Sequence, residues 1–133
     1  MAVAIWTFYD CVSPLGSNEI ADWYSALMEE EREVFDGFLK ALSKTRKLGE
    51  PDVKKLKGRQ NRGLFELRFT AGKKEHRVLG GYGPEGADHG FIMLIGCTHK
   101  QKIYSPPSAF ETARKRMTQI KSGLATVKKH EHI

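Results

Sequence analysis

Three consecutive β-strand patterns in the middle of the chain do most to limit the folds it can adopt. Residues 63–69 alternate apolar and polar side chains, which is typical of a half-buried strand, and the turn 71–74 leads into a second strand over 75–82. The third pattern, 91–95, has no polar face and predicts a central strand covered on both sides. Together these patterns favour a small, twisted, mainly antiparallel sheet.

Helical patterns flank this sheet. Residues 4–9 read as a first strand, and Ser17 is expected to cap the helix that follows. A helical apolar stripe then runs to residue 42, and the acidic run 29–31 predicts a break into two helices. Ser105 and Pro106 fit the start of a C-terminal helix. The order predicts an α+β domain with an N-terminal helical hairpin and a C-terminal helix, packed on one face of the sheet. The members of the two apolar helix faces are Ile20, Tyr24, Leu27, Met28, Phe35, Phe38 and Leu42, and Phe110, Ala113, Met117 and Ile120.

The size of the chain predicts one domain with one core, since it has 133 residues, 40% of them hydrophobic. The core is expected to span about residues 4–120, and the basic residues 121–133 are expected to form a flexible tail. The start of the chain lacks the features of a signal peptide, and no apolar run reaches transmembrane length. Cys11 and Cys97 match no zinc or disulfide spacing, so we expect a reduced, cytoplasmic protein. We expect no metal and no cofactor.

Charge is distributed unevenly along the chain, whose formal net charge is +6. Residues 1–39 carry eight acids and one base, whereas residues 40–62 carry nine bases and two acids. Residues 99–133 carry eight Lys or Arg and two acids. Such polarity indicates one face for a nucleic acid and another for a different partner, although two solvated helix faces of opposite sign would give the same pattern.

Two arginines on the neighbouring strands suggest a phosphate site. Arg68 and Arg77 lie on strands about 4.8 Å apart, so their guanidinium groups can converge on one phosphate if they share a face. The alternative is a solvated face on which Arg68 pairs with Glu66 or Glu75. His76 is expected to point to the opposite face.

Further polar residues follow the central strand, where a rigid sheet would fix them. His99 is a candidate general acid or base, and Lys100, Lys102 and Tyr104 follow it. A purely structural histidine is the alternative. Before the sheet lies a basic cluster suited to RNA backbone contacts, unless it is a solvated loop. Its members are Lys54, Lys55, Lys57, Arg59 and Arg62.

The ordered set of these segments resembles the RelE/ParE toxin superfamily, and within it the HigB-like, phage-derived branch. The segments are residues 55–58, 63–68, 76–79 and 92–96, then His99 with Lys100, then a Pro-led helix over 109–116. The resemblance implies a toxin of a type II toxin–antitoxin module that enters the ribosome and cuts mRNA without a metal. The ribose 2′-OH would attack the adjacent phosphate, which requires a base, positive charge and a proton donor.

By position, the resemblance implies that Arg68 and Arg77 stabilise the scissile phosphate and that His99 and Lys100 transfer protons or bind phosphate. Lys102 and Tyr104 lie near further active groups of some relatives, and the basic cluster matches the surface that holds ribosomal RNA. A helix-turn-helix antitoxin is the implied partner. Glu66 stands where the most active RelE-type members have a basic residue. Two alternatives stay open: a ParE-like inhibitor of DNA gyrase, and a non-catalytic module that binds nucleic acid or antitoxin, which Glu66 keeps open.

Overall fold

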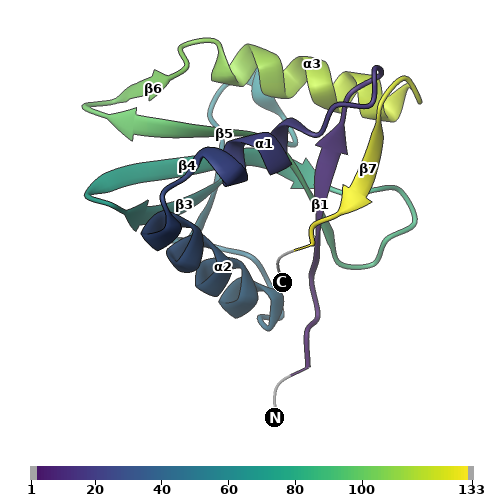
Figure 1. Ribbon diagram of the computed structural model, residues 1–133. Coiled ribbons are helices and arrows are strands. Elements are labelled where there is room, and N and C mark those ends of the chain that lie inside the picture. Colours follow the sequence, from purple (N-terminus) through teal and green to yellow (C-terminus); the bar gives the residue numbers. More distant parts are fainter. Residues whose placement is uncertain (1–2, 132–133) are drawn as a thin grey trace.

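The computed structural model describes residues 3–131 and has a seven-stranded sheet with helices on both sides (Figure 1). The element order is β1 (Thr7–Val12), α1 (Glu19–Ala26), α2 (Glu29–Ser43), β2 (Val53–Lys55), the 3-10 helix η1 (Arg59–Asn61), β3 (Phe65–Ala71), β4 (Lys74–Tyr82), β5 (Gly90–Lys100), β6 (Ile103–Ser105), α3 (Ala109–Lys121) and β7 (Thr126–Lys129). This mixed α and mainly antiparallel β arrangement confirms the expected fold class and is compatible with a RelE-like fold.

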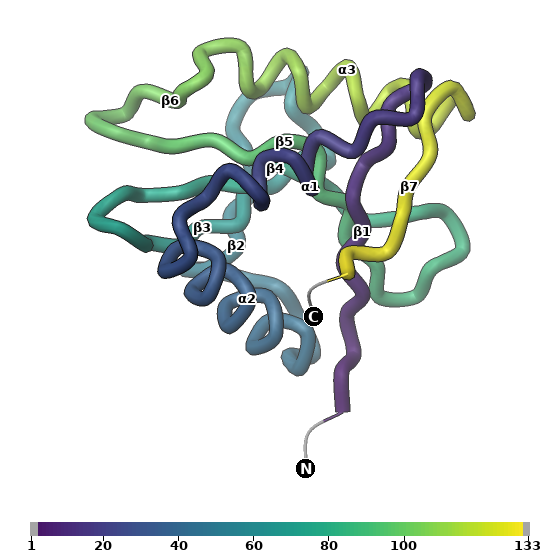
Figure 2. Tube along the Cα trace, viewed as in Figure 1, coloured from purple at the N-terminus to yellow at the C-terminus, as the bar shows by residue number. Residues whose placement is uncertain are grey.

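The central part of the sheet is the predicted meander. Strands β2, β3, β4 and β5 pair antiparallel in chain order, and β6 folds back onto the end of β5. Strand β1 lies parallel to β5, and β7 pairs antiparallel with β1 at the far edge. The β3–β4 and β5–β6 turns therefore project from the same side of the molecule (Figure 2).

Both faces of the sheet are covered by helices, so the prediction that the helices pack on one face was wrong. Phe91 and Met93 of β5 pack with Phe35 and Leu39 of α2 and with α1 residues on one face. Their sequence neighbours, Ile92 and Leu94, pack with Ala113 and Met117 of α3 on the other. The apolar character of β5 requires this second cover, because alternate side chains of a strand point to opposite faces.

Helix boundaries differ from the sequence prediction at two starts. Asn18, rather than Ser17, caps α1, since its Oδ1 accepts a hydrogen bond of 2.9 Å from the backbone N–H of Ala21. Helix α3 begins at Ala109 rather than at Pro106, because Ser105 still pairs with Thr98 as part of β6. The predicted break between the first two helices is confirmed at residues 27–28.

Within the segment expected to form a flexible tail, residues 126–129 form strand β7 of the sheet. Strand β7 covers the edge of β1, and the backbone N–H of His130 donates to the carbonyl of Phe8. His130 is buried, with its Nδ1 2.8 Å from Oδ1 of Asp10. Pairing with β7 gives hydrogen-bond partners to the backbone groups at the edge of β1, which would otherwise be exposed and unpaired. Residues 132 and 133 of the predicted tail lie outside the described residues.

The first strand begins three residues later than predicted, at Thr7 rather than at residue 4. Among residues 3–131, no helix is long and apolar enough to cross a membrane.

Candidate functional site

A group of polar side chains gathers on the face of β3, β4, β5 and β6 that also carries α3. Arg68 pairs with Arg77, Glu75 pairs with His99, and His99 pairs with Tyr104. Residues directly opposite on neighbouring strands point to the same face. We call this group the strand-face cluster, and its members are Glu66, Arg68, Glu75, Arg77, His99 and Tyr104.

Arg77 occupies the middle of the cluster and is enclosed, with only 3% of its surface exposed. Its Nη2 donates to Oε1 of Glu75 at 3.4 Å, and its Nη1 donates to the carbonyl of His76 at 2.9 Å. Its Nε lies 3.4 Å from Oε2 of Glu66, an ion-pair contact without a directed hydrogen bond. The positive charge of Arg77 is therefore largely balanced by the carboxylates of Glu66 and Glu75.

Glu66 links this arginine to the neighbouring hairpin. Its buried carboxylate accepts a hydrogen bond of 2.6 Å from the hydroxyl of Tyr104. Burial, and then this hydrogen bond, raise the pKa of Tyr104 above its usual value. The phenol thus stays protonated at neutral pH and acts as a hydrogen-bond donor.

His99 lies between Arg77 and Tyr104 and is only half-buried. Its Nδ1 is 3.4 Å from Nη2 of Arg77, and its ring centroid is 4.7 Å from that of Tyr104. Because a guanidinium group can only donate hydrogen bonds, Nδ1 must be the acceptor in this contact. We infer that the neutral ring carries its proton on Nε2, which makes Nε2 the atom able to donate a hydrogen bond to a ligand.

Arg68 is the accessible member of the arginine pair. Its side chain is half-buried, and no ion pair among residues 3–131 involves it. Together with Asp52, Phe38 and Arg77 it lines an open depression of about 440 Å³. The sequence left open that Arg68 pairs with Glu66 or Glu75, but the structure gives both carboxylates to Arg77 instead.

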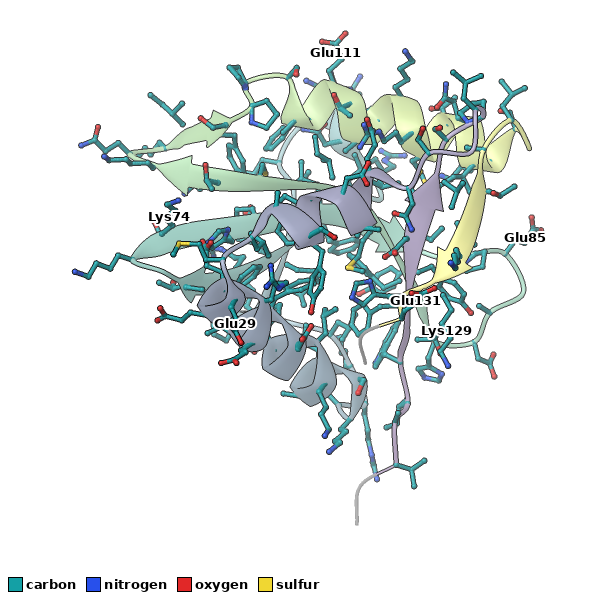
Figure 3. The ribbon with its side chains drawn as sticks, in the orientation of Figure 1. Glu29, Lys74, Glu85, Glu111, Lys129 and Glu131 are labelled. Atoms are coloured by element: carbon teal, nitrogen blue, oxygen red, sulfur yellow. The ribbon has the colours of Figure 1, made fainter. Side chains whose placement is uncertain are left out.

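The lysines predicted near His99 do not join the strand-face cluster. Lys100 follows His99 within β5, so strand alternation sends its side chain to the opposite face. Lys102 is exposed in the β5–β6 turn. The neighbouring β3–β4 turn adds two cations that the sequence analysis did not single out, Lys73 and Lys74 (Lys74 is labelled in Figure 3). Both turns border a hollow of about 400 Å³ beside His99.

The basic cluster of the sequence lies at the β2 edge of the sheet. Lys54 pairs with Glu66 across β2 and β3 and therefore lies on the face of the strand-face cluster. Lys55 is exposed on β2, and Lys57, Arg59 and Arg62 are exposed around η1. The structure thus brings one member of the basic cluster next to the candidate site and leaves the others along the adjacent edge.

Sequence reasoning identified Arg68, Arg77 and His99 as site residues. It treated Glu66 and Glu75 only as possible ion-pair partners of Arg68, and Glu66 also as a difference from the RelE-type members. The signal was present, because Glu66 and Glu75 lie two residues from the arginines and so share their strand face. Cys97, on the same face, donates from Sγ to the carbonyl of Arg77, and burial raises the pKa of its thiol to about 12. This thiol is not an activated nucleophile.

Comparison with known proteins gives one family. A sequence model of the family described as phage-derived protein Gp49-like (DUF891) matches residues 22–118, which run from within α1 through most of α3 and include the whole strand-face cluster. No curated protein and no solved structure matches the chain. The chain belongs to the phage-derived Gp49-like family, which is associated with toxin–antitoxin systems.

Proposed function

We propose that this protein is the toxin of a type II toxin–antitoxin module and that it cleaves mRNA on the ribosome. The observation that carries the proposal is the juxtaposition of Glu66, Arg77, His99 and Tyr104 beside the accessible Arg68. The cluster offers acid–base groups and a free cation on one rigid surface, at the edge of which lie several lysines and arginines. These are the groups that RNA cleavage by an internal 2′-OH requires.

In this proposal the 2′-oxygen loses its proton, bonds to the adjacent phosphorus and displaces the 5′-oxygen of the next nucleotide. The 5′-oxygen takes up a proton, and the products are a 2′,3′-cyclic phosphate and a 5′-hydroxyl end. His99 can supply that proton only as the imidazolium ion, in which Nδ1 is protonated and gives up its contact with Nη2 of Arg77. Nε2 then gives its proton to the 5′-oxygen, and the ring returns to the neutral form that accepts from Arg77. Glu66, which contacts Nε of Arg77 and accepts a hydrogen bond from Tyr104, is the candidate base.

The two arginines have different roles. Arg68 is half-exposed and unpaired among the described residues, so we assign it to the scissile phosphate, which a guanidinium group can bind with two hydrogen bonds. Arg77 is a positioning residue, because its enclosed guanidinium group fixes Glu66, Glu75 and His99 relative to one another. Lys54 adds positive charge on the same face.

A non-catalytic module that binds nucleic acid is the second candidate, and one observation favours it. Glu66 and Glu75 offset the charges of Arg68 and Arg77, so the strand-face cluster itself has little excess positive charge for a phosphorane. In either case we propose that a helix-turn-helix antitoxin binds the toxin and keeps it from the ribosome.

Cell-free translation of a defined mRNA, with 5′ ends mapped by primer extension, tests the proposal. The variants are Arg68→Ala and His99→Ala, with Arg46→Ala, on the exposed loop after α2, as the matched control. We expect ribosome-dependent cuts with the wild-type and control proteins and a loss of about 10²–10⁴-fold in the His99 variant. An mRNA left intact while translation stops would favour the non-catalytic candidate. Translation that continues on an intact mRNA would exclude action on the ribosome by either candidate.

A further inference from the structure

A second, separate cationic hollow lies between η1 and α3. It has a volume of about 170 Å³ and is floored by the buried side chains of Leu64 and Met117. Its polar wall combines two segments that are more than fifty residues apart in the sequence. The polar and charged residues that line it are Gln60, Arg62, Arg114, Thr118 and Lys121.

Arg114 is held in place in this wall rather than extended freely into solvent. Its Nη1 donates a hydrogen bond of 2.7 Å to Oδ1 of Asn61. Asn61 is itself 3% exposed, and its Nδ2 donates to the carbonyl of Lys57 at 2.7 Å. A buried amide thus orients the guanidinium group in advance, which leaves its remaining donors for a ligand and lowers the entropic cost of binding one.

The charge of the hollow is not neutralised by the protein. No acidic residue lines it, and none of the ion pairs among residues 3–131 involves Arg62, Arg114 or Lys121. In contrast, Arg77 in the strand-face cluster is paired with two glutamates. Three cations with an oriented guanidinium and two neutral hydrogen-bonding side chains suit a tetrahedral oxyanion.

The hollow also continues the basic edge of the sheet. Arg62 belongs both to its wall and to the basic cluster around η1. On α3, Phe110 packs on Tyr104 of the strand-face cluster, with ring centroids 4.7 Å apart, and Thr118 lies two turns further along the same helix. At 1.5 Å per residue this separates the hollow from the cluster by about 12 Å along the helix axis. A nucleic-acid backbone that lies in the cluster can therefore reach the hollow with a neighbouring phosphate.

We propose that the η1–α3 hollow is a second phosphate subsite, which binds an RNA backbone phosphate away from the scissile bond. This inference rests on the proposed RNA substrate and extends it. Arg114, Thr118 and Lys121, which lie on a helix outside the basic cluster, are assigned to substrate binding rather than to chemistry.

The test uses fluorescence anisotropy with a single-stranded, fully 2′-O-methylated oligoribonucleotide, which presents phosphates but has no 2′-OH to attack. The variant Arg114→Gln with Lys121→Gln is compared with the matched control Arg46→Gln with Lys47→Gln, which removes the same charge from the exposed loop after α2. The slope of log affinity against log salt is expected to fall in magnitude by about 0.7 in the hollow variant, the value for one lost phosphate contact on a single strand. The control is expected to keep the wild-type slope.

A second variant guards against misfolding. Thr118→Glu places a carboxylate in the hollow from an exposed helix position and leaves the Arg114–Asn61 hydrogen bond in place. It should weaken RNA binding while its thermal melt stays that of the wild type. Equal slopes in the hollow and control variants, unchanged binding by the Thr118 variant, or no RNA binding by the wild-type protein would each overturn the subsite. The subsite would also be overturned if a glutamate-rich peptide bound the hollow variant more weakly than the wild type while the RNA probe bound both equally. That result would identify an acidic protein as the ligand.

The same probe separates this inference from the proposed function. The methylated RNA has no 2′-OH to attack, so its binding is measured without cleavage. If no protein cuts mRNA but the slope difference persists, the proposed endonuclease is wrong and the phosphate subsite stands.

Discussion

Arg68 and Arg77 are direct partners across β3 and β4 and share one face of the sheet, yet only Arg68 is accessible to a ligand. Two arginines this close would repel each other, and the structure relieves the repulsion by placing Glu66 and Glu75 on Arg77. One arginine thus organises the site while the other faces solvent. Their substitutions should therefore have different consequences, although their positions in the two strands are equivalent.

Loss of Arg77 should destabilise the fold. In the Arg77→Ala variant, the buried carboxylate of Glu66 loses its cationic partner, so we expect the free energy of unfolding to fall by about 3–5 kcal/mol. The Arg68→Ala variant should change it by about 0.5 kcal/mol or less. Urea denaturation followed by circular dichroism measures both. Similar values for the two variants would show that the enclosure of Arg77 is not energetically important, and the double variant Arg77→Met with Glu66→Leu should recover part of the loss.

The core and central strands were largely predictable, because the pattern of each segment is local. Residues 91–95 have no polar side chain, and the structure covers both faces of β5 as that pattern predicts. The turn at residues 71–74 fixes the register of β3 with β4, and this register places Arg68 opposite Arg77. His76 points to the other face, as expected, and contacts Glu31 of α2.

Other features depended on tertiary partners that leave no local trace. Strand β1 inserts between β5 and β7, and nothing in the residues of β1 specifies a parallel neighbour eighty residues away. The short, charged strand β7 read as a tail because its pairing with β1 and the contact between His130 and Asp10 join it to distant segments of the chain. Which carboxylate binds which arginine also depends on burial, and Arg77 is buried where Arg68 is not.

The hydrogen bond between Tyr104 and Glu66 should contribute measurably to stability. Because the acceptor is a carboxylate, Tyr104→Phe is expected to lower the free energy of unfolding by about 1.5–3 kcal/mol. The phenylalanine ring keeps the packing on Phe110, so the change isolates the hydroxyl. Tyr82→Phe, in which the hydroxyl of a more exposed tyrosine is removed, is the control. A Tyr104 variant as stable as this control would indicate that water replaces the hydrogen bond.

Acid should weaken the contact between α2 and the sheet. The pKa of Glu31 is lowered, chiefly because its carboxylate accepts a hydrogen bond from the backbone N–H of Met28 and also because it lies 2.9 Å from Nε2 of His76. A lowered pKa gives stability that is fully present above the unfolded-state pKa of about 4.3 and is lost as the pH falls through the folded value. Stability measured from pH 6 to pH 2.5 should therefore drop less steeply for Glu31→Gln than for the wild type. Parallel curves for the two proteins would contradict this role of Glu31.

Two glycines should respond in opposite ways to the same substitution. A Cβ at Gly80 would collide with the backbone carbonyl of Ile92 and the ring of Phe91, at the irregularity where β4 changes register with β5. Because backbone cannot yield as a flexible side chain does, Gly80→Ala is expected to cost about 1–3 kcal/mol. Gly37 lies within α2 with open space around its Cα, so Gly37→Ala should stabilise the protein by about 0.5–1 kcal/mol. Thermal or urea unfolding of the two variants measures both changes, and a Gly80 variant as stable as the wild type would show that β4 and β5 can separate at this point without loss.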